Sequence, residues 1–218
     1  MTIGKGALRT LALLTATTAT VVGLSAAPAL ASTTLTVKVT GGGTYTAKAA
    51  KTVLTDGHVS VTCAAKGSKP GSEASGTIAS ATHKGASPVE VGPASKLAFN
   101  NCTGPLGPVT TTIQSLPYKV NVDSKTSSKG DTDGLISGVK VAVKMVGCAF
   151  TVTGSAPGYY ANSKHTLNMT SKLPTKAGSS AKLTVSGVKG CEGLVKNGDH
   201  PTYVSTYTLS RKITIKSS

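Results

Sequence analysis

Lys51-Thr52-Val53-Leu54-Thr55-Asp56-Gly57-His58-Val59-Ser60-Val61-Thr62-Cys63 is the stretch of sequence that decides the fold. On both sides of Asp56-Gly57, apolar or β-branched residues alternate with polar ones, as in a strand with one buried face. Asp-Gly between two such runs favours a two-residue turn, because that turn needs positive φ angles, which Gly and Asp tolerate. The stretch predicts a β-hairpin with its turn at Asp56-Gly57.

Similar alternating runs, separated by short turns rich in Gly and Pro, follow along the rest of the chain. They span residues 33–40, 76–81, 96–100, 109–114, 118–122, 135–145, 148–154, 166–171, 181–186, 203–209 and 212–216. Two segments, Ala65 to Glu73 and Asp123 to Gly134, have the composition of exposed loops. The pattern predicts an all-β fold whose antiparallel sheets pack as a sandwich or close as a barrel.

The first residues have the order of an export signal. Lys5 and Arg9 precede an apolar run over 11–24, and Ala29-Leu30-Ala31 supplies the small residues that a signal peptidase requires. We expect an N-terminal signal helix, a signal peptide over 1–31 and a single all-β domain over 32–218, with cleavage after Ala27 or a retained anchor as the alternatives. The product is predicted to be secreted and extracellular, with no membrane segment after cleavage.

The chain has four cysteines, an even number, and this predicts two disulfides in an exported protein. They are Cys63, Cys102, Cys148 and Cys191, and no two have the Cys-x-x-Cys spacing of a redox or zinc site. Sequential pairing, Cys63 with Cys102 and Cys148 with Cys191, is favoured, and the other connectivities stay open. Each bridge would stabilise the fold by about 4 kcal/mol.

An excess of lysine gives the chain a formal charge of +15. This charge favours anionic partners, but Arg211 is the only Arg after the signal and no aromatic residues cluster with the lysines, so we predict no nucleic-acid binding. In 36–40 and 139–144, lysines occupy one side of an extended strand. We interpret them as a solvated face that also discourages edge-to-edge pairing of sheets, and anionic cell-wall polymers as the candidate partner.

Two parts of the chain share a short pattern that is compatible with an internal duplication. Cys102-Thr103-Gly104 and Cys191-Glu192-Gly193 both read Cys-x-Gly, and each Cys has a Tyr 16 positions downstream, Tyr118 and Tyr207. The half-units would be 32–122 and 135–218. Because the first cysteine of each half aligns less well, an unrepeated domain remains the alternative. In either case we expect one shared core, since each half is short.

Several stretches carry a resemblance that covers nearly all of the chain after the signal: Phe99-Asn100-Asn101-Cys102-Thr103-Gly104-Pro105-Leu106-Gly107, Leu116-Pro117-Tyr118, Gly134-Leu135-Ile136-Ser137-Gly138-Val139 and Gly190-Cys191-Glu192-Gly193-Leu194, with residues 203–209. These stretches resemble a family of small exported actinobacterial proteins. The resemblance implies export and a β fold with two bridges, and no activity or site residues come with it. The sequence departs from the family at Tyr118, where Trp or another aromatic is expected after Pro117, and in its heavier Lys content.

Two stretches that read Ser-Gly-Val-Lys fit the form Ser-x-x-Lys, in which a lysine activates a serine nucleophile. They are Ser137-Gly138-Val139-Lys140 and Ser186-Gly187-Val188-Lys189. Both lie in predicted strand and turn sequence, and the partner motifs Ser-Asp-Asn and Lys-Thr-Gly do not occur. A turn followed by a solvent-facing lysine explains each motif better.

The histidines and acidic residues form no diagnostic catalytic or metal-binding pattern. His58, His165 and His200 are the candidate bases of a site that only folding would assemble. Asp131-Thr132-Asp133-Gly134 begins like a calcium loop but lacks the closing Glu, so an Asp-Gly turn is the preferred interpretation. The sequence predicts no catalytic residue, no metal ligand and no cofactor, and it leaves an enzyme open.

One aromatic pair, Tyr159-Tyr160 beside Pro157-Gly158, is a candidate surface patch, but core packing or strand pairing is the preferred interpretation. The preferred function is a non-catalytic extracellular module that binds or scaffolds at the cell envelope through its cationic surface. The alternatives are a secreted hydrolase with a dispersed site, and a secreted protease inhibitor that presents the Ala65 to Glu73 loop. The pattern does not indicate an oligomeric state.

Overall fold

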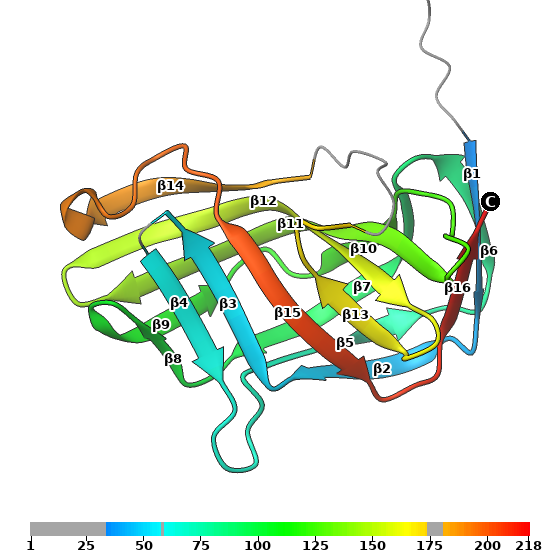
Figure 1. Cartoon of the computed structure of the whole chain (residues 1–218), viewed down its shortest axis with the longest axis horizontal. Helices are drawn as coiled ribbons and strands as arrows, with labels where there is room; N and C mark the ends of the chain where they lie inside the picture. The colour runs from blue at the N-terminus through cyan, green and yellow to red at the C-terminus, as the bar shows by residue number, and fades with distance from the viewer. Residues whose placement is uncertain (1–33, 58, 174–180) are drawn as a thin grey trace, which may run out of the picture. The chain divides into compact units, whose positions relative to one another are not determined.

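The computed structural model describes residues 34–57, 59–173 and 181–218, and these residues form an antiparallel all-β fold (Figure 1). The predicted signal peptide and signal helix over 1–31, and His58, lie outside the described residues. The strands are β1 (Thr34–Thr40), β2 (Gly43–Ala49), β3 (Lys51–Asp56), β4 (Val59–Ala64), β5 (Ser72–Ile78), β6 (Thr82–Ala86), β7 (Val89–Phe99), β8 (Cys102–Gly104), β9 (Gly107–Ile113), β10 (Tyr118–Val122), β11 (Asp131–Met145), β12 (Cys148–Ala161), β13 (Thr166–Met169), β14 (Leu183–Gly190), β15 (Thr202–Leu209) and β16 (Thr214–Ser217). One 3-10 turn, η1 (Cys191–Gly193), follows β14.

Eight of these strands close into a ring of hydrogen-bonded neighbours. The order is β12-β13-β15-β2-β5-β7-β10-β11, and β11 pairs back onto β12. We call this part of the molecule the closed half. The hydrogen bonds therefore describe the barrel alternative of the predicted fold. In the ring, β2, β5, β7 and β10 come from the expected half-unit 32–122 and are consecutive, and the strands that belong mainly to the half-unit 135–218 are consecutive as well.

The long strands β11 and β12 continue past the closed half into a second part. There the order is β14-β12-β11-β9-β8-β4-β3-β15, and among the described strands β14 pairs only with β12. We call this part the seam half, and the interval between β14 and β15 the seam. The segment before β15 crosses the seam, because Val185 N donates to Asp199 O and Gly198 N donates to Val185 O, each at 2.9 Å.

A separate three-stranded sheet, β16-β1-β6, forms a cap against one end of the closed half (Figure 1). Val37 and Ile213 are fully buried, and Tyr160 on β12 donates a hydrogen bond to the carbonyl oxygen of Ile213 at 2.7 Å. Thr132 on β11 likewise donates to Ile215 O at 3.0 Å. The cap is thus joined to the closed half by packing and by hydrogen bonds.

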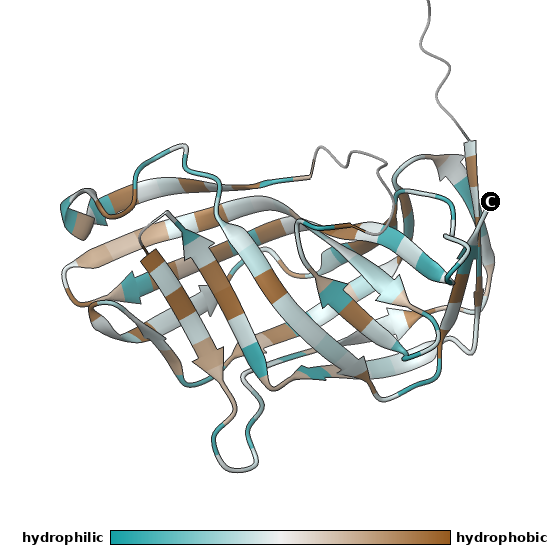
Figure 2. Cartoon of the chain, viewed as in Figure 1, coloured by the Kyte–Doolittle hydropathy of each residue, from teal (hydrophilic) through white to brown (hydrophobic). Residues whose placement is uncertain are grey.

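The core follows the alternation seen in the sequence. Along β4 and β12, apolar side chains point inward and Thr or Ser residues point outward, which Figure 2 shows as alternating bands along the strands. The predicted disulfides Cys63–Cys102 and Cys148–Cys191 are both present. Disulfides of this kind indicate an oxidising environment.

The hairpin prediction is confirmed with a shift of one residue at its turn. Asp56 pairs with Val59, so Asp56 is the last residue of β3 and Gly57 takes the positive φ of 50°. Residues 131–134 were expected in a loop, but they open β11 and Thr132 and Asp133 are buried. The chain therefore leaves the sheet only over 123–130. The buried backbone groups of Thr132 and Asp133 need hydrogen-bond partners, and the strand provides them.

Three strands were not expected from the sequence: β2, β6 and β8. They contain Gly43, Gly85 and Gly104, residues that local propensity disfavours in strands, and they form because neighbouring strands complete their hydrogen bonds. The loop predicted over Ala65 to Glu73 is exposed over 65–69, but Ser72 begins β5 and is fully buried. Within the described residues, no helix is long and apolar enough to cross a membrane.

Candidate functional site

The interior contains an apolar cavity of about 160 Å³. Strands of both halves and the cap contribute to its wall, including Leu54, Leu97, Phe99, Leu167 and Ile213. Leu54, Leu97, Phe99 and Leu167 point inward yet are only partly buried, because they face the cavity rather than another layer of side chains. The core is therefore hollow where a well-packed interior would be filled.

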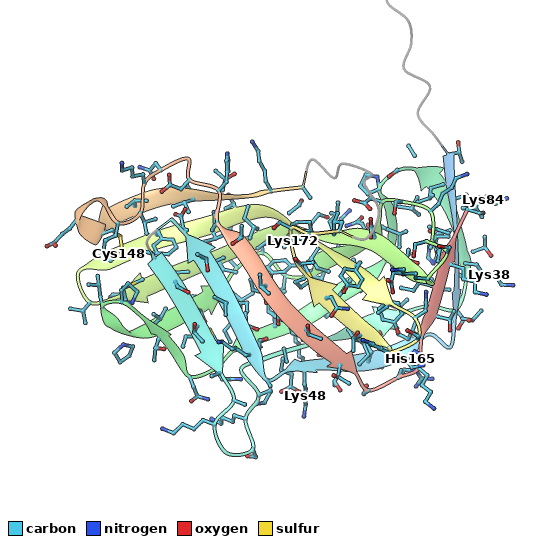
Figure 3. All side chains as sticks on the ribbon, in the orientation of Figure 1. Lys38, Lys48, Lys84, Cys148, His165 and Lys172 are labelled. Atoms are coloured by element: carbon cyan, nitrogen blue, oxygen red, sulfur yellow. A yellow bond between two sulfur atoms is a disulfide. The ribbon has the colours of Figure 1, made fainter. Side chains whose placement is uncertain are left out.

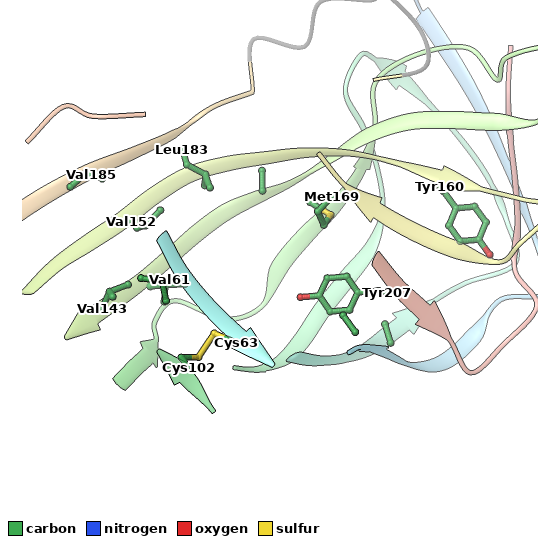
Figure 4. Close-up of a cluster of buried hydrophobic side chains, with 14 of the residues drawn as sticks. Val61, Cys63, Cys102, Val143, Val152, Tyr160, Met169, Leu183, Val185 and Tyr207 are labelled. Atoms are coloured by element: carbon green, nitrogen blue, oxygen red, sulfur yellow. A yellow bond between two sulfur atoms is a disulfide. The ribbon is translucent and has the colours of Figure 1, made fainter. Parts of the chain in front are cut away.

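All six tyrosines of the chain line this cavity: Tyr45, Tyr118, Tyr159, Tyr160, Tyr203 and Tyr207. Figure 4 shows Tyr207 and Tyr160 together with buried side chains from several other strands. The tyrosines of the chain are thus concentrated at one place.

Three of the tyrosines are tied to the backbone of the barrel wall. Tyr45 donates to Pro93 O at 3.2 Å, Tyr118 to Lys140 O at 2.6 Å and Tyr160 to Ile213 O at 2.7 Å. Burial raises the pKa of Tyr45 and of Tyr160 to about 12. These hydroxyls already have hydrogen-bond partners within the protein, and their bonds stabilise the cavity wall.

Tyr203 and Tyr207 form a hydrogen bond with each other and belong to a cluster of side-chain hydroxyls. Their oxygens lie 2.6 Å apart, and the Tyr203 ring also packs edge-on against Phe99 with a centroid distance of 6.3 Å. Thr52 on β3 lies beside them and contacts Ser72 at 2.5 Å and Ser205 at 2.9 Å between hydroxyl oxygens. Thr52, Ser72 and Ser205 are buried. We call Tyr203, Tyr207, Thr52, Ser72 and Ser205 the hydroxyl cluster.

Burial raises the pKa of Tyr203 well above its usual value of 10, and the neighbouring Tyr207 raises it further. Hydrogen bonds from Thr52 and Ser205 lower the same pKa, but by less. The Tyr203 hydroxyl therefore stays protonated and neutral throughout the physiological pH range. The cluster offers donors and acceptors to the cavity without bringing a negative charge into it.

The structure favours core packing over a surface patch for Tyr159 and Tyr160. Tyr160 is only 5% exposed, and its hydroxyl is bonded to the cap, so it is a core residue. Tyr159 is partly buried and lines the cavity. Neighbouring residues of a strand point to opposite faces, and both of these side chains nevertheless line the cavity.

The candidate bases His165 and His200 lie at opposite ends of β15. His165 O accepts from Leu209 N at 3.3 Å, whereas His200 stands just before Thr202 and contacts Leu183 O through Nδ1 at 2.9 Å. The eight residues of β15 span about 25 Å, so the structure does not bring these two histidines together. The third candidate, His58, lies outside the described residues.

An acidic pair lies beside His200 at the end of the seam half. Burial raises the pKa of Asp56, the nearby Asp199 carboxylate raises it further and shares a hydrogen bond with it, and His200 partly offsets this rise. Among the described residues, no group of three or more His, Cys, Asp or Glu side chains is arranged to hold a metal ion. Of the Ser-x-x-Lys serines, Ser137 accepts from Asn121 Nδ2 at 2.9 Å, and Ser186 is exposed.

The lysine-bearing faces predicted from the sequence lie on the outside of the molecule. Lys140 and Lys144 point outward from β11, and Lys189 on β14 stands opposite Ala149, which neighbours Lys144 across the β11–β12 pair. Outward Ala, Thr and Ser residues occupy the positions around them, and the paired segments 110–113, 140–144, 149–154 and 183–189 contain no Asp or Glu. We call the outer surface of β9, β11, β12 and β14 the Lys-Thr face.

The cap has a second such set, with Lys38 directly opposite Lys216 and with Lys84 on the next strand. Figure 3 places Lys38 and Lys84 on the cap and Cys148 at the opposite end of the molecule. By contrast, Lys48 and Lys119 are paired with Glu73 and Glu90, at 3.8 and 3.1 Å.

Comparison with protein-family models, with curated proteins and with solved structures finds no match to this chain. The site is therefore interpreted from its own geometry. Sequence reasoning missed the hydroxyl cluster, although Tyr203-Val204-Ser205-Thr206-Tyr207 places two tyrosines and a serine on one face of a strand. What the sequence alone does not show is that Thr52 and Ser72 meet that face.

Proposed function

We propose that this protein is an exported, non-catalytic binding module that holds a small apolar molecule inside its barrel. The observation that carries the proposal is the cavity of about 160 Å³ with its tyrosine-lined, largely apolar wall. Apolar cavities of about 150 Å³ stay dry and take up molecules of the size of benzene. A small apolar ligand in a preformed cavity would leave water at little conformational cost.

The test uses fluorobenzene as the probe and measures its binding by ¹⁹F NMR and by the shift in melting temperature. A ligand of this size is expected to bind with a Kd of about 0.1 to 1 mM, which corresponds to about 4 to 5 kcal/mol. Ligand that binds only the folded state raises the melting temperature by mass action. The expected result is therefore a saturable ¹⁹F signal with a matching thermal shift.

Two Phe substitutions on the same strand separate the cavity from the surface. Ala74 on β5 lines the cavity, so Ala74→Phe fills it and should abolish fluorobenzene binding. Thr77, also on β5, is exposed, so Thr77→Phe should leave binding intact. Binding that is absent in the natural chain, or equal in the two variants, would overturn the proposal.

Export is supported by the pattern over residues 1–31 and by the two disulfides, which suit an oxidising compartment. The resemblance to small exported actinobacterial proteins agrees with it. Expression of the full chain in an actinobacterial host should place the protein in the medium with Ser32 as its first residue. Retention in the cytoplasm with an intact N-terminus would contradict this part of the proposal.

A second function, retention at the cell envelope by anionic wall polymers, is favoured by the Lys-Thr face. Lys140, Lys144 and Lys189 project from one surface whose paired segments lack acidic residues, so nothing on those segments neutralises them. Polyanions bind such surfaces through several ammonium groups at once and release counterions. Binding of this kind weakens steeply as the salt concentration rises.

The matched experiment compares two triple variants of equal charge in co-sedimentation with purified anionic cell walls. One variant changes Lys140, Lys144 and Lys189 to Gln, and the control changes Lys38, Lys84 and Lys216 on the cap. Loss of sedimentation at low salt only in the first variant supports the Lys-Thr face. Equal behaviour of the two variants would show that the overall charge, and not this face, is responsible.

A further inference from the structure

We propose that the ligand is an uncharged molecule with a ring-sized apolar skeleton and a single oxygen function, and that this oxygen bonds to the Tyr203–Tyr207 hydroxyl pair. The inference rests on the proposed binding function and adds the chemical class of the ligand to it. Phenols and small alcohols or ketones belong to this class. Hydrocarbons lack the oxygen, and carboxylates carry a charge.

The first argument is the number of hydroxyl groups that meet in the cluster. The Tyr203 oxygen has Thr52 and Ser205 as hydrogen-bond partners and lies 2.6 Å from the Tyr207 oxygen, where either tyrosine can be the donor. A contact between two hydroxyls uses only one of their two protons, so the pair keeps donor capacity for another acceptor. A ligand oxygen in the cavity is suitably placed to be that acceptor.

The second argument is the contrast with the other cavity tyrosines. The hydroxyls of Tyr45, Tyr118 and Tyr160 donate to backbone carbonyls of the wall. If one of these hydroxyls turned to a ligand, the fold would lose a buried hydrogen bond. Tyr203 and Tyr207 bond to side-chain hydroxyls instead. A hydroxyl rotates freely and both donates and accepts, so the pair rearranges around a ligand at little cost.

The third argument is the charge of the lining. Within the described part of the chain, the cavity wall contains no Lys, Arg or His, and its one carboxylate, Asp133, is fully buried and already engaged with other groups of the protein. An anionic ligand would have to lose its hydration without gaining a counter-charge. An uncharged ligand avoids this cost, and the neutral hydroxyl cluster matches it.

The experiment compares three probes with one skeleton: toluene, p-cresol and benzoate. Isothermal titration calorimetry at neutral pH should give p-cresol an affinity about tenfold above that of toluene, the value of one additional hydrogen bond. Benzoate should show no measurable binding. Each probe has about the size that the cavity accommodates.

Two Tyr→Phe variants locate the effect. Tyr207→Phe removes the proposed donor and should bring p-cresol down to the affinity of toluene, while toluene binding is unchanged. Tyr160→Phe, the control, removes a hydroxyl that donates to Ile213 O and should preserve the tenfold preference. Because the preference is a ratio measured within one variant, a change in stability does not affect it.

The outcomes distinguish this inference from the proposed function. If no probe binds, the proposed function itself fails. If toluene and p-cresol bind the natural chain equally, or if Tyr207→Phe keeps the preference, the cavity binds apolar molecules but the role of the hydroxyl pair is overturned. If benzoate binds as well as p-cresol, the restriction to uncharged ligands is wrong.

Discussion

The closed half and the seam half of the barrel are held together by different means. In the closed half, eight strands complete a ring of hydrogen bonds, and the cap covers its end. In the seam half no strand pairs β14 with β15 among the described residues, and both disulfides, Cys63–Cys102 and Cys148–Cys191, lie there. Covalent links are found where the ring of hydrogen bonds is incomplete.

The comparison indicates how a cavity-bearing fold remains stable. A hollow interior loses packing energy, so the strands around it need other support. The closed half obtains it from a continuous ladder of backbone hydrogen bonds. The seam half obtains it from the bridges, which restrict the unfolded chain and join β4 to β8 and β12 to η1.

The largest expected effect follows from removal of one bridge. Replacement of Cys148 and Cys191 by Ala should lower the free energy of unfolding by about 4 kcal/mol. Native-state hydrogen exchange should then show lost protection in β14, which pairs only with β12, before β5, β7 and β10. If protection falls equally in both halves, the two halves are not distinct in stability.

The closed half should be sensitive to bulk at Gly134, where the backbone of the paired strand lies close. A Cβ at Gly134 on β11 would meet the carbonyl oxygen of Asn121 on the paired strand β10. Gly134→Ala is therefore expected to cost about 3 kcal/mol in urea unfolding. Gly85→Ala on the cap, where the nearest atom lies 3.9 Å away, is the control and should be close to neutral. Equal losses at both positions would argue against close strand packing at Gly134.

These contrasts show which parts of the fold could be predicted from the sequence. The alternation in 51–63, and its recurrence, were sufficient for an all-β class, and the spacing of the cysteines was sufficient for the two bridges. Strands with glycine or few apolar residues, such as β2 and β8, were missed because their stability comes from neighbouring strands. Residues 131–134 looked like a loop because polar residues are buried there at the join with the cap.

The candidate site was less predictable than the fold. Core packing was the preferred interpretation of Tyr160, but a local sequence does not show that its hydroxyl reaches a carbonyl 53 residues away. The hydroxyl cluster joins Thr52 to Ser205 across 153 positions, a contact that only the pairing of β3 with β15 creates. A cavity has no local sequence signature, because it depends on what the surrounding side chains fail to fill.

A smaller effect is expected where the two halves meet along β11. The register of the β11–β12 pair shifts between Ile136 and Val139. Next to this shift, the Tyr118 hydroxyl accepts a hydrogen bond from Lys140 N at 3.1 Å and donates one to Lys140 O at 2.6 Å. Tyr118→Phe should cost about 2 kcal/mol, because a buried N–H loses its acceptor. Hydrogen exchange at Lys140 should rise locally. A loss spread over the cap instead would show that Tyr118 does not secure this irregularity.

The smallest expected effect concerns the acidic pair at the end of the seam half. Burial and Asp199 raise the pKa of Asp56, so the folded state favours its protonated form. The corresponding stability is present below the unfolded-state pKa of about 3.9 and is lost as the pH rises through the higher folded-state pKa. Asp56→Asn mimics the protonated form, so it should raise the melting temperature at pH 7 and leave it nearly unchanged at pH 3. The gain should be under about 1 kcal/mol, because partly exposed charges interact weakly.

Glu90→Gln provides a control of opposite sign for this pH dependence. It removes the ion pair with Lys119, whose atoms are 3.1 Å apart, and should lower the melting temperature slightly at pH 7. Opposite shifts in the melting temperatures of Asp56→Asn and Glu90→Gln would show two different roles. The seam half tolerates a destabilising carboxylate pair beside His200, whereas the exposed ion pair of Glu90 stabilises the closed half. A fall in melting temperature for Asp56→Asn at pH 7 would mean that the ionised Asp56 stabilises the fold, and the direction assigned to its pKa would then be wrong.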